Sequence, residues 1–143
     1  MRHTPAAIPA DVGVRLQVKS EPGEPDSLEA ELVVGSVPLP AFDHGPLDLV
    51  ELQRSIERDG TYFIWTCSCG EPGCGGRFDG VEVRHEGELV RWHDRDMHRK
   101  FIFRVDDLRR TFEEAIAEAR LLLSEQKSLA WAPGGNHQLT HVA

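Results

Sequence analysis

The amino-acid sequence predicts an α+β domain, with a mostly antiparallel sheet of about six strands in the order ββαβββα and two helices packed on one face. Several short segments alternate apolar with polar residues, which is the period of half-buried strands. Two longer segments repeat apolar residues at helical spacing. The connections are short and join successive strands by turns, which favours antiparallel pairing over crossover helices.

The first two strands are expected within residues 12–34, where the sequence EPGEPD turns the chain between them. One side of each predicted strand is apolar, and the other side carries charged or polar residues. The predicted inward positions are Val12, Val14, Leu16 and Val18, followed by Leu28, Ala30, Leu32 and Val34. The two strands therefore form a predicted hairpin.

The segment PLDLVELQRSIERDG predicts the first helix. Asp48 is placed to accept hydrogen bonds from the first free N–H groups, and Glu51 completes a capping box three residues later. Leu47 and Leu52 form an apolar pair across this cap. A glycine follows the last turn, where glycine ends many helices.

Four further elements complete the predicted fold. TYFIWTC, rich in aromatic and β-branched residues, predicts a strand, and so does KFIFRV. Residues 80–93 predict a second hairpin between them. Residues 107–125 repeat apolar side chains at helical spacing and predict the final helix.

The second hairpin is expected to turn at Glu86 and Gly87. In that register His93 pairs with Gly80, at the end of the hairpin next to the preceding loop. Trp92 falls on the apolar side of its strand, so we expect it to be a core residue.

The length and charge of the chain exclude several classes of protein. With 143 residues it suits one domain, expected at residues 11–128 between tails at 1–10 and 129–143. The formal net charge of −8 argues against binding to nucleic acid or to an anionic membrane, because both depend on lysine and arginine. No secretory signal pattern is visible, and three cysteines do not suit a disulfide scaffold. A cytoplasmic protein is therefore expected.

The most specific motif is TCSCGEPGCGG, which contains all three cysteines of the chain. Cys67 and Cys69 point to the same side of an extended segment, and a Pro72-Gly73 turn directs Cys74 back toward them. Three thiolates that meet within one turn can supply three of the four ligands of a structural zinc ion.

The predicted hairpin ranks the histidines as the fourth zinc ligand. His93 lies nearest the cysteine turn and ranks first, His98 ranks second, and His85 lies at the opposite tip of the hairpin. The sequence predicts either no cofactor or one structural zinc ion, bound by Cys67, Cys69, Cys74 and His93. Two other interpretations stay open: a glycine-rich turn whose thiols pack as small apolar groups, and a redox or disulfide role.

An aromatic strand leading into CSCGEPGC, followed by VEVRHEGELVRW and FIFRVDDLRRTFEEAI, resembles a family of small, functionally uncharacterised bacterial proteins. Members of that family carry a C-x-C-G-x-x-G-C turn, a V-x-W strand and a C-terminal helix. The resemblance covers residues 12–122, and the matching positions are Cys67, Cys69, Gly70, Gly73, Cys74 and Trp92. It implies a bacterial cytoplasmic protein and assigns no catalytic residue.

Two classes of function are compatible with these features. The sequence contains no phosphate-binding loop, dinucleotide fingerprint or nucleophile elbow. Together with the acidic composition, this favours a non-catalytic interaction module of an immunity or regulatory type, whose partner is a basic protein. The alternative is a zinc-binding or thiol-based enzyme centred on the cysteine turn.

Overall fold

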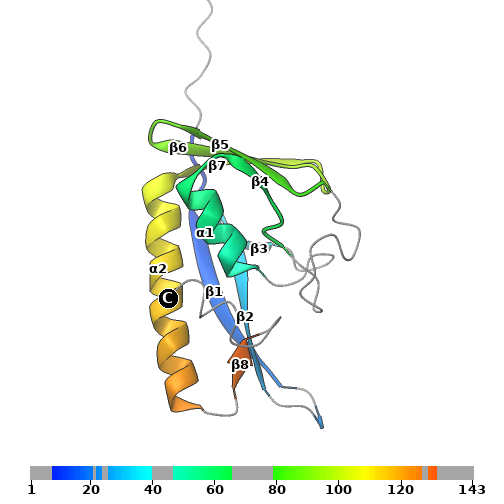
Figure 1. Ribbon diagram of the computed structural model, residues 1–143, viewed down its shortest axis with the longest axis vertical. Coiled ribbons are helices and arrows are strands. Elements are labelled where there is room, and N and C mark those ends of the chain that lie inside the picture. The colour runs from blue at the N-terminus through cyan, green and yellow to red at the C-terminus, as the bar shows by residue number, and fades with distance from the viewer. Residues whose placement is uncertain are drawn as a thin grey trace, which may run out of the picture.

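A computed structural model describes residues 8–20, 22–23, 26–39, 47–65, 79–126 and 129–131. Its elements in chain order are β1 (Val12–Lys19), β2 (Ser27–Val34), β3 (Val37–Leu39), α1 (Leu49–Glu57), β4 (Gly60–Tyr62), β5 (Val81–Glu86), β6 (Leu89–Asp94), β7 (Arg99–Arg104), α2 (Val105–Glu125) and β8 (Ala130–Trp131). α2 packs along β1, and α1 lies beside α2 and β4, while β4 to β7 lie across one end of β1 and β2 (Figure 1).

The predicted α+β class is confirmed, but the strands form two sheets instead of one. The first sheet has the antiparallel order β1-β2-β3, and β8 pairs in parallel with β2. The second sheet has the antiparallel order β4-β5-β6-β7. The two predicted hairpins therefore lie in different sheets, and β3 and β8 come in addition to the expected strands.

The two sheets meet near the start of β1 but do not merge. Ala10 N donates a hydrogen bond to Ile102 O of β7 (2.8 Å), and from there β1 and β7 run in different directions (Figure 1). Farther along β1, Val14 N donates to the Thr111 hydroxyl of α2 (2.8 Å). The Val14 N–H is therefore not available to pair with a further strand on this side of β1. This keeps β1 at the edge of its sheet.

The residues just before α1 connect the two sheets. Leu47 N donates to Ala30 O of β2 (2.9 Å), and Asp48 N donates to Ile64 O (2.8 Å). Leu47 also forms a β-bridge with Trp65. The backbone hydrogen bonds therefore continue from the first sheet, through this short segment, to the chain that follows β4.

The start of α1 confirms the predicted cap and corrects one half of the capping box. Asp48 Oδ1 accepts from Val50 N (3.0 Å) and Glu51 N (3.1 Å). The Glu51 carboxylate does not return to the cap, because Asp48 N already donates to Ile64 O. It accepts instead from Phe63 N (3.3 Å) and so links the helix to the chain after β4.

One core lies between the two helices and the inner faces of both sheets. The predicted alternation is confirmed in β2, where Leu28, Ala30 and Leu32 are buried, but in β1 the predicted inward residue Val18 is 43% exposed. On the other face of that sheet Lys19 pairs with Glu29 (2.9 Å). The largest fully buried side chains are Trp92, Phe103, Leu28, Leu32, Leu47, Leu49, Leu52, Ile64 and Leu108.

The second hairpin differs from its expected register. Its loop is Gly87-Glu88, and Glu86 is already paired with Leu89. Gly87 has a φ of +60°, and tight two-residue hairpin turns need a positive φ at the first loop position. Placing the glycine there moves the pairing, so that His93 lies opposite Glu82 and not opposite Gly80.

The described fold extends slightly beyond the predicted domain limits of 11–128. Ala10 bonds to β7, Leu129 is 5% exposed, and β8 follows it. The rest of the predicted tails, residues 1–7 and 132–143, lies outside the described residues. Neither of the two helices described is long and apolar enough to span a membrane.

Candidate functional site

Polar side chains form defined arrangements on both faces of the second sheet. The inner arrangement lies between Trp65, which follows β4, and Asp79, which precedes β5. The intervening residues 66–78 lie outside the described part of the chain. They include the three predicted zinc ligands, Cys67, Cys69 and Cys74.

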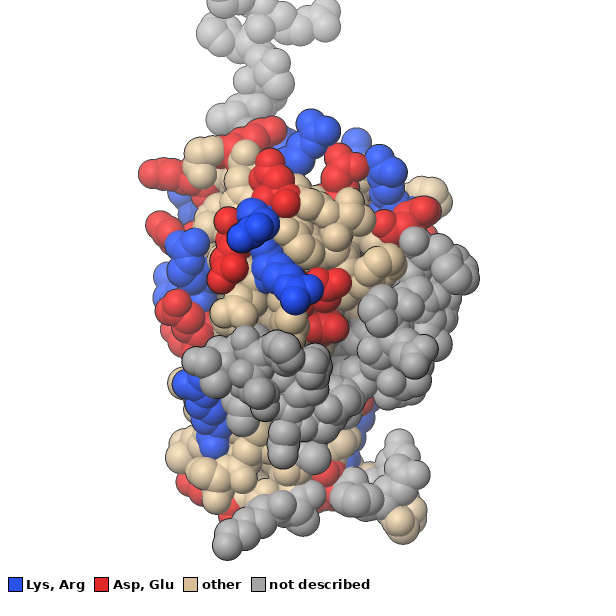
Figure 2. Space-filling model, in the orientation of Figure 1, with Lys and Arg blue, Asp and Glu red and all other residues tan. Residues whose placement is uncertain are grey.

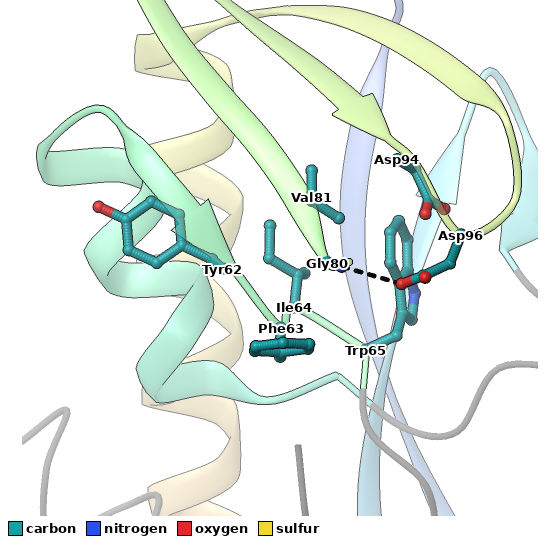
Figure 3. Close-up of a pocket in the computed structure, with 8 residues that line it drawn as sticks. All are labelled: Tyr62, Phe63, Ile64, Trp65, Gly80, Val81, Asp94 and Asp96. Carbon is teal, nitrogen blue, oxygen red and sulfur yellow. Dashed lines mark hydrogen bonds between the residues drawn. The ribbon is translucent and has the colours of Figure 1, made fainter. Parts of the chain in front are cut away.

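Asp96, in the turn between β6 and β7, holds the point at which the chain returns (Figure 3). Its carboxylate accepts hydrogen bonds from Asp79 N and Gly80 N, each at 3.0 Å. Gly80 has a φ of +75°, and a Cβ at this position would lie 3.0 Å from Tyr62 O. Glycine is therefore required by both conformation and space.

A buried ion pair lies beside Asp96. Asp94 is 3% exposed, and its Oδ2 accepts a hydrogen bond from Arg99 Nη2 (2.8 Å) across the β6–β7 pair. The Arg99 guanidinium lies 5.3 Å from the centre of the Trp65 ring and 5.5 Å from that of Phe101. These distances are within the range of cation–π attraction. The pair therefore connects β6 and β7 with the point at which the chain leaves the sheet.

The cavity enclosed by this inner arrangement is very small. It lies between β4, β5 and the two aspartates, Asp94 and Asp96, and measures about 10 Å³ (Figure 3). That is room for about one water molecule. The described residues of the inner face thus lie at both ends of the 66–78 segment, and the cavity between them holds no more than about one water molecule.

Trp92 is a core residue, as predicted. It is 1% exposed and makes edge-to-face contacts with Trp65 and Phe103, at centroid distances of 6.1 and 5.0 Å. Such aromatic pairs add to the stability gained from burial alone. Its Nε1 has no hydrogen-bond partner among the described residues, so packing is its role in this part of the fold.

The two candidate histidine ligands lie apart from the inner arrangement. His93 is on the outer face of the sheet, between Glu82 and Lys100 in the cross-strand pairing. His98 is exposed in the β6–β7 turn, with a φ of +54°. Within the described residues, no three His, Cys, Asp or Glu side chains are grouped so that they could hold a metal ion. Zinc binding stays a prediction, because its three cysteines lie outside those residues.

The outer face of β5, β6 and β7 is a grid of mostly polar side chains. Cross-strand pairing arranges them in three rows, which are Glu82, His93 and Lys100, then Arg84, Arg91 and Ile102, then Glu86, Leu89 and Arg104. An open groove of about 540 Å³ lies over the first two rows, and we call it the outer groove. Its volume is within the range of ligand-binding sites in proteins.

The acidic residues of the outer face are all engaged. Glu82 pairs with Arg95 (2.9 Å) and with Arg84 (3.4 Å). Glu86 pairs with Arg91 (2.6 Å). Each of these ion pairs is at least partly exposed, so each contributes little to stability.

The basic residues of the same face are not all engaged. Lys100, His93 and Arg104 form no ion pair or side-chain hydrogen bond with another described residue. The face carries four lysine or arginine side chains against two carboxylates. Its local charge is therefore positive, although the chain as a whole is acidic.

Sequence reasoning did not identify the outer face. Figure 2 shows basic and acidic side chains interspersed over the end of the molecule that β5, β6 and β7 form. The available signal is the alternation in VEVRHE and RWHD, where every second residue is polar. This alternation predicts strands, but it does not show that three polar strand faces join into one surface.

Comparison of the chain with family models, with curated proteins and with solved structures found no match. The resemblance to small bacterial proteins with a cysteine turn therefore stays a prediction. The assignment of a function depends on the geometry described above.

Proposed function

We propose that this protein is a non-catalytic interaction module that binds a partner protein through the outer face of β5, β6 and β7. The observation that carries the proposal is the outer groove of about 540 Å³, in which Lys100 and His93 are engaged by no other described residue. Charged groups that the fold does not use for its own pairing are available to a partner and can orient it. An immunity-type or regulatory role suits a module of this kind.

Affinity capture with three forms of the full chain tests the proposal. The forms are the parent, Lys100→Glu in the outer groove and Glu114→Lys on the exposed side of α2. Each variant inverts one exposed charge, so the two change the net charge by the same amount in opposite directions. We expect the partner to bind the parent and Glu114→Lys, and to bind Lys100→Glu about tenfold more weakly.

The same experiment separates the two possible binding surfaces. A partner that binds Lys100→Glu as tightly as the parent contradicts the proposal. If that partner is instead lost with Glu114→Lys, it is a basic protein that binds the acidic side of α2, as the net charge alone predicts.

A second candidate function is a zinc-binding or thiol-based enzyme centred on the cysteine turn. It is supported by the way Asp96 and the Asp94–Arg99 pair hold both ends of the 66–78 segment. Fixed ends reduce the entropy that the segment loses when its side chains converge on an ion.

Elemental analysis of protein purified without a tag tests this alternative. About one zinc ion per chain is expected in the parent, with loss of zinc in Cys69→Ser and in His93→Ala. His85→Ala is the control, because His85 lies near the hairpin tip and its ring nitrogen bonds with Ser55 O (2.8 Å). A parent that contains no zinc rules out the metal-dependent form.

A further inference from the structure

We infer that the segment of the partner that enters the outer groove is an acidic, extended peptide. This inference rests on the proposed function and adds the chemistry of the partner to it. The local charge of the outer face and its apolar positions both favour such a peptide.

Local charge and net charge point to opposite partners. The chain carries a net charge of −8, whereas the outer face has twice as many lysine and arginine side chains as carboxylates. Charges farther apart than about 8 Å are largely screened at physiological salt. The groups that meet a docked partner therefore decide its chemistry, and here the unengaged ones, Lys100 and Arg104, are cations.

The apolar positions of the outer face favour a peptide whose side chains alternate. Ile102 lies in the middle row beside Arg91, and Leu89 lies in the last row between Glu86 and Arg104. Both are partly exposed. An extended peptide presents alternate residues to one side. Its acidic side chains can then reach the cations, while its apolar side chains cover the two partly exposed residues.

The same face is less suited to a nucleic acid. Single-stranded nucleic acids bind exposed aromatic side chains by stacking. His93 is the one aromatic residue in the three rows. Trp92 and Phe101 also line the outer groove, but their rings pack against Phe103. Two of the four cations, Arg84 and Arg91, already pair with Glu82 and Glu86, and those carboxylates would repel a row of phosphates. An acidic peptide can place its fewer charges on the unengaged cations alone.

A synthetic probe tests the inference on the full chain. The probe is a rhodamine-labelled peptide of about eight residues that alternates Glu and Val, long enough to cross three strands spaced about 4.8 Å apart. Binding is measured by fluorescence anisotropy at about 0.1 M and about 1 M salt. Two comparison probes are measured in parallel. One is a peptide of the same length that alternates Lys and Val, and the other is an oligothymidylate of similar length.

The expected result is binding of the Glu–Val peptide that weakens at high salt. Lys100→Gln should weaken it about two- to fivefold, the effect of one exposed charge pair, and Arg104→Gln with Lys100→Gln about tenfold. Lys19→Gln is the matched control, because it removes the same charge from the first sheet, where Lys19 pairs with Glu29. It should change the affinity by less than about twofold.

Three outcomes contradict the inference: no binding of the Glu–Val peptide, tighter binding of the Lys–Val peptide, or tighter binding of the oligothymidylate. The proposed function fails separately, if a captured partner binds Lys100→Glu as well as the parent. The two proposals can also be separated. If a captured partner depends on Lys100 but the Glu–Val probe does not bind, the protein is still an interaction module, and the acidic peptide is ruled out as its ligand.

Discussion

The two faces of β5, β6 and β7 use charged residues in opposite ways. On the inner face, Asp94 and Arg99 form a buried pair that packs against aromatic rings. On the outer face, His93 and Lys100 occupy the next pair along the same two strands, and their side chains form no ion pair or hydrogen bond with another described residue. Two neighbouring residue pairs thus have different roles, one in holding the fold and one in presenting a surface.

The difference shows that residue type alone does not indicate a functional residue. A buried charge must be paired, because leaving it without a partner costs several kcal/mol. An exposed charge has no such requirement, and its pairing adds about 0–1 kcal/mol. Substitutions on the inner face should therefore change stability, and substitutions on the outer face should change binding.

The largest expected effect is that of Trp92→Ala. Trp92 is 1% exposed and contacts Trp65 and Phe103, so its truncation should lower the free energy of unfolding by about 3–5 kcal/mol. The neighbouring residue His93 lies on the outer face, so His93→Ala should change the free energy of unfolding by less than about 0.5 kcal/mol. Urea unfolding of both variants measures the contrast, and similar losses would contradict the division of roles.

Asp94→Ala is expected to have the next largest effect, about 2–3 kcal/mol of unfolding free energy. The substitution removes the carboxylate that accepts a hydrogen bond from Arg99 Nη2, and partial exposure of Arg99 keeps the loss below that for a fully buried pair. Glu82→Ala is the control, since it removes two exposed ion pairs and should cost less than about 1 kcal/mol. Thermal melts in which the two variants coincide would show that the inner pair is not structural.

Gly80→Ala should destabilise the fold by about 2 kcal/mol, because the new Cβ meets Tyr62 O at a positive φ. Gly87→Ala is matched in conformation, with a φ of +60°, but nothing lies within 4 Å of its Cβ. It should cost about 1 kcal/mol, the conformational part alone. Chemical unfolding of the pair isolates the steric contribution at the point where the chain re-enters the sheet.

The smallest expected effect on stability is that of Lys100→Gln, below about 0.5 kcal/mol. Lys100 is exposed and has no ion pair with another described residue, so the fold loses no contact when its charge is removed. Calorimetry should show a melting temperature close to that of the parent. A clear drop would mean that Lys100 supports the fold, and its role in recognition would then need another test.

Residue patterns predicted the local features of the fold well. The alternation in β2, the Asp48 cap and the burial of Trp92 were predicted correctly, because each depends on residues close together in sequence. The predicted register of the second hairpin was wrong, because Gly87 is the first residue of the loop and not the second. The register is decided by the turn, because a tight two-residue loop needs a positive φ at its first position and glycine adopts this φ readily.

The candidate site was harder to predict than the fold. The cysteine turn was the most specific motif, but its residues lie outside the described part of the chain. His93 was singled out as a zinc ligand, and the structure places it beside Lys100 in the outer groove. A groove assembled from three strands depends on which faces meet across the sheet, and a single segment carries no signal for that.

By itself, the sequence determined the α+β class and the positions of most strands and both helices, because apolar periodicity and helix caps act over a few residues. Only the tertiary structure decided that the strands form two sheets. That division depends on contacts between distant residues, such as the bond from Val14 N to Thr111 Oγ1. The positive outer face arises for the same reason, since its charges come from three strands that are brought together only by folding.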